Sequence, residues 1–213
     1  MKTLFKNGTV IDYGTKTEDV TLYAKWIPKT YNIYYWDEGA KTFSGIHGSN
    51  YPTQHTYGTA TVLDVPTKEG YDFGGWHLMS DCSDNSIDVI GATDYDNSVR
   101  LYAKWTPAIV NYTVKRYFQN VSGTDYEQNL TDYPNLIKSG TALLTTNVSA
   151  DDVFGFNSSW IVQQTIKADG STVVEIRYNR KTITYTFDTN GGKWSDNTTA
   201  NKAVSGLFGA EVS

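Results

Sequence analysis

The chain has 213 residues and a formal net charge of −5 at pH 7, with 6 Trp and 16 Tyr against 2 Met and 1 Cys. The acidic balance argues against a nucleic-acid partner, because a phosphate backbone is recognised by a basic face and the Lys and Arg residues here are scattered singly. The lone cysteine, Cys82, excludes an internal disulfide, and no apolar run is long enough to insert into a membrane.

One block of the sequence occurs twice. Residues 20–28 read VTLYAKWIP and residues 99–107 read VRLYAKWTP, so that Trp26 and Trp105 lie 79 positions apart (105 minus 26). In both blocks every second residue is apolar, which is typical of a strand with one buried face. The closing proline ends the strand, because it has no N–H to donate to a neighbour. The spacing predicts tandem repeats.

A weaker copy of the closing strand follows at residues 173–180, with Val174, Ile176 and Tyr178 on one face. Each closing strand precedes an opening strand, and these openers lie at residues 31–36, 111–118 and 182–188. The predicted units are residues 1–28, the end of a preceding repeat; 29–107, a complete repeat; 108–181, a related β module; and 182–213, the start of a following repeat. We expect the two complete units to lie end to end in a fragment of a longer protein.

A glycine-rich bend lies inside the first complete unit. The run GYDFGGW at residues 70–76 predicts a close approach of two backbones, with Tyr71, Phe73 and Trp76 in the core. The run VFGFNSSW at residues 153–160 is its expected counterpart in the next unit.

Turn signals complete the pattern. Asp169-Gly170 predicts a hairpin between two alternating runs, and the Asn-Gly-Gly sequence at 190–192 predicts another turn. Only residues 92–98 and 148–155 suit one or two helical turns. The expected fold class is therefore mostly β or α+β, with at most a short helix in each unit.

These motifs resemble a known family. GYDFGGW followed by LYAKW, and the opening block YTFDTNGG, resemble the Listeria–Bacteroides repeat, also called the internalin B-type repeat, of which residues 29–107 look like one complete copy. Residues 108–181 are similar to a mucin-binding-like module, through YTVKRYFQN and DGSTVVEIRYNRK. The resemblance implies small β-grasp-like modules, in which a curled sheet packs on a short helix or loop. It also implies export to the bacterial cell surface and a place in long adhesins or internalins, and it supplies no catalytic residues.

No motif in the sequence indicates catalysis, a cofactor or a required metal. A metal site at His77 with Cys82 is the less favoured alternative to an ordinary loop histidine and cysteine. Acidic residues cluster in two loops that could converge on calcium, although solvated turns are the favoured interpretation. These residues are Asp81, Asp84, Asp88, Asp94 and Asp96.

The six tryptophans divide into two groups. Trp26, Trp76, Trp105 and Trp160 recur at equivalent points of the units, and we expect them in the cores. Trp36 and Trp194 lie off this pattern, and they are the candidate ligand contacts, because an exposed aromatic ring can stack on a sugar or fill a partner's pocket.

Repetition without concentrated chemistry favours a non-catalytic stalk or spacer in a secreted or cell-surface protein, with a role in adhesion as an extension of it. The alternatives are a module that binds a surface protein or glycan through a sheet edge or the loop at 77–98, and an accessory region of a large secreted enzyme.

The two incomplete ends suggest a weak head-to-tail self-contact between copies, since neither can bury its apolar face alone. In that arrangement Ile183, Tyr185 and Phe187 share a core with Val20, Leu22 and Trp26 of the next molecule. The alternative is that each end folds back on its neighbouring unit.

Overall fold

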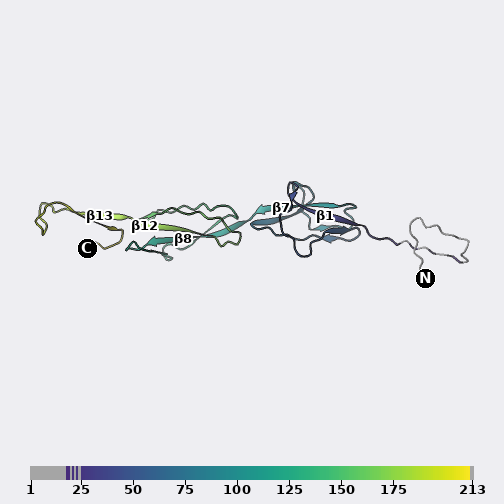
Figure 1. Cartoon of the computed structure of the whole chain (residues 1–213), viewed down its shortest axis with the longest axis horizontal. Coiled ribbons are helices and arrows are strands. Elements are labelled where there is room, and N and C mark those ends of the chain that lie inside the picture. The colour runs from purple at the N-terminus through teal and green to yellow at the C-terminus, as the bar shows by residue number, and fades with distance from the viewer. Residues whose placement is uncertain (1–17, 20, 22, 24, 212–213) are drawn as a thin grey trace.

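A computed structural model of the chain describes residues 18, 19, 21, 23 and 25–211. Throughout these residues the chain forms strands and loops, and Figure 1 shows the main sheets one after another along the long axis. The prediction of a mostly-β fold is confirmed. The strands are β1 (Thr30–Asp37), β2 (Lys41–Thr42), β3 (Gln54–Thr56), β4 (Thr61–Val62), β5 (Tyr71–His77), β6 (Val89–Ile90), β7 (Val99–Pro107), β8 (Ile109–Gln119), β9 (Tyr126–Glu127), β10 (Leu136–Thr141), β11 (Phe156–Ser158), β12 (Val173–Arg180), β13 (Thr182–Phe187) and β14 (Lys202–Leu207).

The helical turns predicted at residues 92–98 and 148–155 are not formed, so the helix implied by a β-grasp-like module is missing from the described residues. In the second segment the side chain of Gln163 bonds to the backbone of Val148. Its Oε1 accepts from the N–H of Val148 at 2.9 Å, and its Nε2 donates to the C=O of Val148 at 2.7 Å.

The first unit, residues 29–107, contains a sheet with the order β2-β1-β7-β5, and β3 also pairs with β1. Its first and last long strands, β1 and β7, lie side by side and run parallel, with Tyr35 opposite Leu101. The apolar residues of β7 point to the core as the alternation predicts, with Leu101 and Ala103 fully buried. Tyr102, on the other face of β7, is also buried, and its C=O accepts from the Cys82 thiol at 3.9 Å.

The second unit, residues 108–181, repeats this plan with the order β10-β8-β12-β11, and β9 pairs with the far end of β8. Here β8 and β12 are the parallel pair, with Val114 opposite Val174. Val174, Ile176 and Tyr178 are buried on one face of β12, and the residues between them are exposed, as predicted. Whether the two units are independent domains with the predicted boundaries stays a prediction.

The doubled glycine of the first unit forms a bulge. The ladder between β5 and β7 is in step from Tyr71 to Phe73, shifts at Gly74 and Gly75, and resumes at Trp76. Gly75 has φ +106°, and a Cβ there would overlap the side chain of Ser86, so only glycine fits. The bulge turns Trp76 into the core, where it is 1% exposed.

The second unit lacks this bulge, and the predicted core position of Trp160 is wrong. Counted from the two glycine bends, Trp76 lies six residues after Gly70 (76 minus 70), and Ile161 lies six residues after Gly155 (161 minus 155). Ile161 packs against the core of the second unit, and Trp160 is 90% exposed. Trp160 thus occupies the position of Gly75.

The turn at Asp169-Gly170 is present, with Gly170 at φ +75°, but the predicted hairpin around it is not. The run before the turn pairs with residues 143–146 instead of with β12: the N–H of Leu143 donates to the C=O of Ile166, and the N–H of Ile166 to the C=O of Leu144. The side chain of Thr172 closes the turn by accepting from the N–H of Lys167 at 2.8 Å.

The last described segment is a two-stranded antiparallel sheet, β13 with β14. The predicted turn at 190–192 is present, with positive φ at Asn190 and Gly191. Tyr185 and Phe187 of β13 are exposed. Of the residues predicted to meet them in another molecule, Val20 and Leu22 lie outside the described residues, as does most of the predicted unit at 1–28, and Trp26 is 88% exposed.

Candidate functional site: joints between units and an open groove

The same joint connects consecutive units at two places. At the first, the N–H of Ala108 donates to the C=O of Gly70 at 2.9 Å, and the C=O of Ala108 accepts from the N–H of Ala142 at 2.9 Å. The linking residue therefore uses both backbone groups, one on the glycine bend of the unit before it and one on the unit after it.

At the second joint Lys181 takes the place of Ala108. Its N–H donates to the C=O of Gly155 at 2.8 Å, and its C=O accepts from the N–H of Phe208 at 2.8 Å. The Phe208 ring meets the ring of Phe154 edge-on at 5.2 Å, and Arg180 donates to the C=O of Phe208 at 2.6 Å. The last segment is therefore packed against the second unit of its own chain.

Each joint depends on a glycine and on a left-handed residue opposite it. Gly70 has φ +75° and Gly155 has φ +81°. A Cβ on Gly70 would lie 2.9 Å from the Leu143 side chain, and one on Gly155 would overlap the Phe208 ring. Leu143 itself has φ +65°, which is costly for a residue with a Cβ, so the joint holds it there.

Half of this joint recurs at the start of the first unit. The C=O of Lys29 accepts from the N–H of Tyr57 at 2.9 Å, and Gly58 follows with φ +92°, as Leu143 and Gly209 do at the other joints. Trp26 lines an open apolar pocket beside Tyr57.

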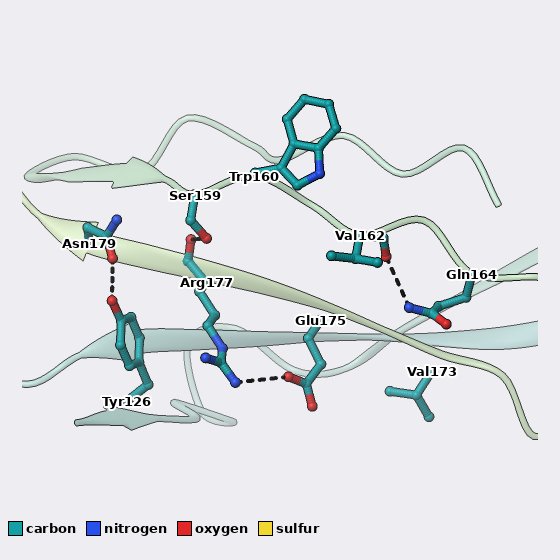
Figure 2. A pocket seen from close by; sticks show the side chains of 9 residues that line it. All are labelled: Tyr126, Ser159, Trp160, Val162, Gln164, Val173, Glu175, Arg177 and Asn179. Carbon is teal, nitrogen blue, oxygen red and sulfur yellow. Dashed lines mark hydrogen bonds and ion pairs between the residues drawn. The ribbon is translucent and has the colours of Figure 1, made fainter.

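A groove of about 660 Å³ lies on the second unit, between β12 and the segment that follows β11. Figure 2 shows β12 along one side and residues 159–164 along the other, with the Trp160 indole turned away from β12. The lining residues are Tyr126, Ser159, Trp160, Val162, Gln164, Val173, Glu175, Arg177 and Asn179.

Polar contacts fix one end of the groove. The Tyr126 hydroxyl donates to Oδ1 of Asn179, and the Arg177 guanidinium lies 5.5 Å from the Tyr126 ring centre. Arg177 also pairs with Glu175 at 3.5 Å (Figure 2), and both side chains are largely exposed. Such exposed ion pairs contribute little to stability, so these charges remain free to meet a partner.

The main chain of β12 is unpaired along part of this groove. The β11 ladder ends at Ser158 opposite Tyr178, after which the N–H of Ser159 donates to the C=O of Arg177 at 2.8 Å. Because β12 runs parallel to β8, its even-numbered residues bond to β8 and its odd-numbered residues direct their backbone to the other edge. Within the described residues, no partner on that edge bonds to the main chain of Val173 or Glu175.

The two tryptophans predicted as ligand contacts are far from this groove. Trp36 lies on β1 opposite Tyr102 and Thr42, and it is partly exposed. Trp194 lies in the loop between β13 and β14, where its Nε1 donates to the C=O of Ala200 at 2.7 Å. The structure brings neither residue together with other candidate ligand contacts.

The histidine and cysteine considered as a metal pair have other partners. His77 Nδ1 lies 2.9 Å from the C=O of Asp84, and the Cys82 sulfur donates to the C=O of Tyr102 at 3.9 Å. Burial raises the pKa of the Cys82 thiol from 9.0 to about 11.

The acidic loops make turns. Asp81 binds Ser83, and the Ser83 hydrogen bonds lower the pKa of the Asp81 carboxyl. Asp84 accepts from the N–H groups of Leu78 and Met79. Asp94 accepts from the N–H of Gly91. Among the residues that the structure describes, no group of three or more His, Cys, Asp or Glu is placed to hold a metal ion.

The sequence reasoning missed both the joints and the groove. The joints had a signal, because each bend glycine precedes an aromatic residue in a recurring place: Gly70 before Tyr71 and Gly155 before Phe156. The groove had a weaker one, the absence of a doubled glycine before Trp160.

Comparison with known proteins covers part of the chain. A protein described as a candidate membrane protein of Evansella cellulosilytica is 32% identical over 171 residues, which are 76% of this chain and 20% of that protein. A candidate Gly-rich membrane protein of the same organism is 30% identical over 125 residues, 57% of this chain and 13% of that protein. The chain thus spans a fifth or less of the length of these relatives. No helix in the described residues has the length and apolarity to cross a bilayer.

The family comparison concerns the first unit. The model of the Listeria-Bacteroides repeat domain matches residues 31–104. The internalin B-type and mucin-binding-like assignments stay predictions. The first complete unit of this chain, over residues 31–104, therefore matches a Listeria-Bacteroides repeat domain.

Proposed function

We propose that this chain is a non-catalytic spacer region of a bacterial surface protein, in which successive units are locked to one another by the repeated joint. The observation that carries the proposal is that Ala108 and Lys181 make the same two backbone bonds to their neighbours. A link whose N–H and C=O are both bound leaves little freedom for one unit to swing against the next.

The surface location rests on the family match and on the relatives, two proteins described as candidate membrane proteins, of which this chain corresponds to a small part. A spacer that holds another part of a long protein away from the cell needs stiffness along its length and no chemistry of its own. Secretion and a place outside the cell belong to the proposal.

The test uses the full chain with Gly70→Ala, and Gly48→Ala as the control, since Gly48 has open space around it and no positive φ. We expect Gly70→Ala to speed amide exchange at Ala108 at least ten-fold while the buried amide of Leu101 is unchanged, and to broaden the distribution of lengths in solution scattering. Gly48→Ala should match the wild type. Independent tumbling of the two units in wild-type NMR relaxation would refute the stiff joint.

A second candidate function, binding of a partner by the second unit, is favoured by the open groove beside β12. Reproducible hydrolysis of a glycan or peptide by the pure chain would contradict both candidates.

A further inference from the structure

The open edge of β12 covers the first part of the strand, before the stretch that is paired with β11. Val173 and Glu175 each direct an N–H and a C=O to this edge, and neither group has a partner among the described residues there. From Val173 to Arg177 the edge is roughly 13 Å long at about 3.3 Å per residue. An unpaired edge of this kind is a template for another strand.

The first unit shows what occupies the equivalent edge. Counted back from the joints, Leu101 corresponds to Val174, since each lies six residues before the last residue of its strand (107 minus 101, and 180 minus 174). In the first unit β5 continues past the glycine bulge and pairs with β7 as far as Tyr102. In the second unit β11 stops at Ser158. In the first unit the outer edge of the closing strand is therefore covered by an extended strand, and the second unit offers the same kind of edge.

We propose that the groove between β12 and residues 159–164 binds an extended polypeptide segment of another protein, which adds to the edge of β12 as a strand antiparallel to it, in line with β11. The proposal is independent of the spacer function. Its backbone partners are the N–H and C=O groups of Val173 and Glu175, and its side wall is Val162, which is 62% exposed. The exposed carboxylate of Glu175 favours a strand with a basic residue opposite it.

The geometry is tested first in the free full-length chain by amide hydrogen exchange. The N–H groups of Val174 and Ile176 bond toward β8, and they should exchange at least a hundred-fold more slowly than those of Val173 and Glu175. Equal protection at all four amides would show that the edge is already covered, and it would overturn the proposal.

Binding is tested by selecting linear seven-residue peptides from a display library on the immobilised full chain. We expect the selected peptides to protect the Glu175 amide. N-methylation at every second peptide residue should weaken binding at least ten-fold, and N-methylation at the intervening residues should change it less than two-fold. Val162→Arg should weaken binding at least ten-fold, whereas Val65→Arg, at another largely exposed valine, in the first unit, should leave it unchanged.

Three results would overturn the proposal. One is that no peptide is enriched. Another is that a panel of glycans binds the wild type and not Trp160→Ala, while Trp26→Ala is unaffected, which would make the exposed tryptophan a sugar-stacking surface. The last is that the chain alone forms a concentration-dependent dimer in which Glu175 becomes protected, which would assign the edge to a second copy.

Discussion

The closing strand of the first unit, β7, is paired along its outer edge as far as Tyr102, whereas that of the second unit, β12, is paired only as far as Arg177. Both strands lie in the same parallel register beside the opening strand of their unit. At the place where the pairing differs, the first unit has Gly74-Gly75 and the second has Ser159-Trp160. The two units therefore differ both in the glycine bulge and in how far the outer edge of the closing strand is paired.

Equivalent positions on the opening strands of the two units hold buried side chains of opposite charge. Asp37 lies opposite Ala103 and accepts from Trp105 Nε1 at 2.8 Å and from Ser44 Oγ at 2.5 Å. Arg116 lies opposite Ile176, and it donates to the C=O of Pro134 at 2.8 Å. Its Nε is buried without a partner. Both units therefore bury a charged side chain at this position, and the hydrogen-bond partners around it differ with the sign of the charge.

The largest expected effect contrasts two tryptophans. Trp76→Ala should lower the free energy of unfolding of the first unit by about 3–5 kcal/mol, because it removes a large buried side chain. Trp160→Ala should cost less than about 0.5 kcal/mol in the second unit, because its ring is exposed. Native-state amide exchange reports each unit separately. A comparable loss for both variants would contradict the different roles of the two residues.

The bulge itself gives the next effect. Gly75→Ala should destabilise the first unit by about 2–3 kcal/mol, because the new Cβ meets Ser86 and φ is positive. Conversely, replacing Ser159 and Trp160 together by glycine should allow the β11 ladder to continue, and amide protection should appear at Glu175. Denaturant titration of the first variant and amide exchange of the second are the measurements. An unprotected Glu175 amide would show that the loop after residue 160 also keeps the edge open.

The buried charges should differ by a smaller amount. Asp37→Ala should cost about 1–3 kcal/mol, because it leaves the Trp105 N–H and the Ser44 hydroxyl without their acceptor. Arg116→Met should cost less than about 1 kcal/mol, because the unpaired Nε already offsets part of what the guanidinium gains. Denaturant titration of the two variants compares them, and a larger loss for Arg116→Met would reverse this ranking.

The smallest effect is the pH dependence of Cys82. Burial holds its pKa at about 11 in the folded chain, against 9.0 ordinarily, so folding favours the protonated thiol. Its contribution to stability is complete below about pH 9 and is lost as the pH rises toward 11. Because Cys82 belongs to the first unit alone, its rate of alkylation at pH 8 should report the opening of that unit. Rapid alkylation without denaturant would contradict its burial.

Much of the strand arrangement was predictable from the sequence, because it follows from the local alternation of apolar and polar residues. The period-2 pattern of residues 99–107 and 173–180 identified the buried faces of β7 and β12, and Asn190-Gly191 identified a turn. The alternation did not predict the burial of Tyr102, which lies on the other face of β7 and is 9% exposed.

The candidate site was not predictable in the same way. Trp160 seemed equivalent to Trp76 by residue type, but it lies only five residues after its bend glycine (160 minus 155), and Ile161, one residue later, packs against the core. The predicted hairpin at Asp169-Gly170 failed because the preceding run pairs with residues 143–146, a choice made by tertiary contacts. Which strand edge remains unpaired depends on such long-range pairing, and the local alternation of residues carries no information about it.

The parallel pairing of first and last strands has a mechanical consequence. Because β1 enters the first unit at one end and β7 leaves it at the other, tension along the chain pulls these neighbours in opposite directions along their common ladder, from Ile33 opposite Val99 to Asp37 opposite Ala103. All the hydrogen bonds of the ladder then bear the load together, whereas a hairpin pulled from its open end loses its bonds one at a time. β8 and β12 are loaded in the same way.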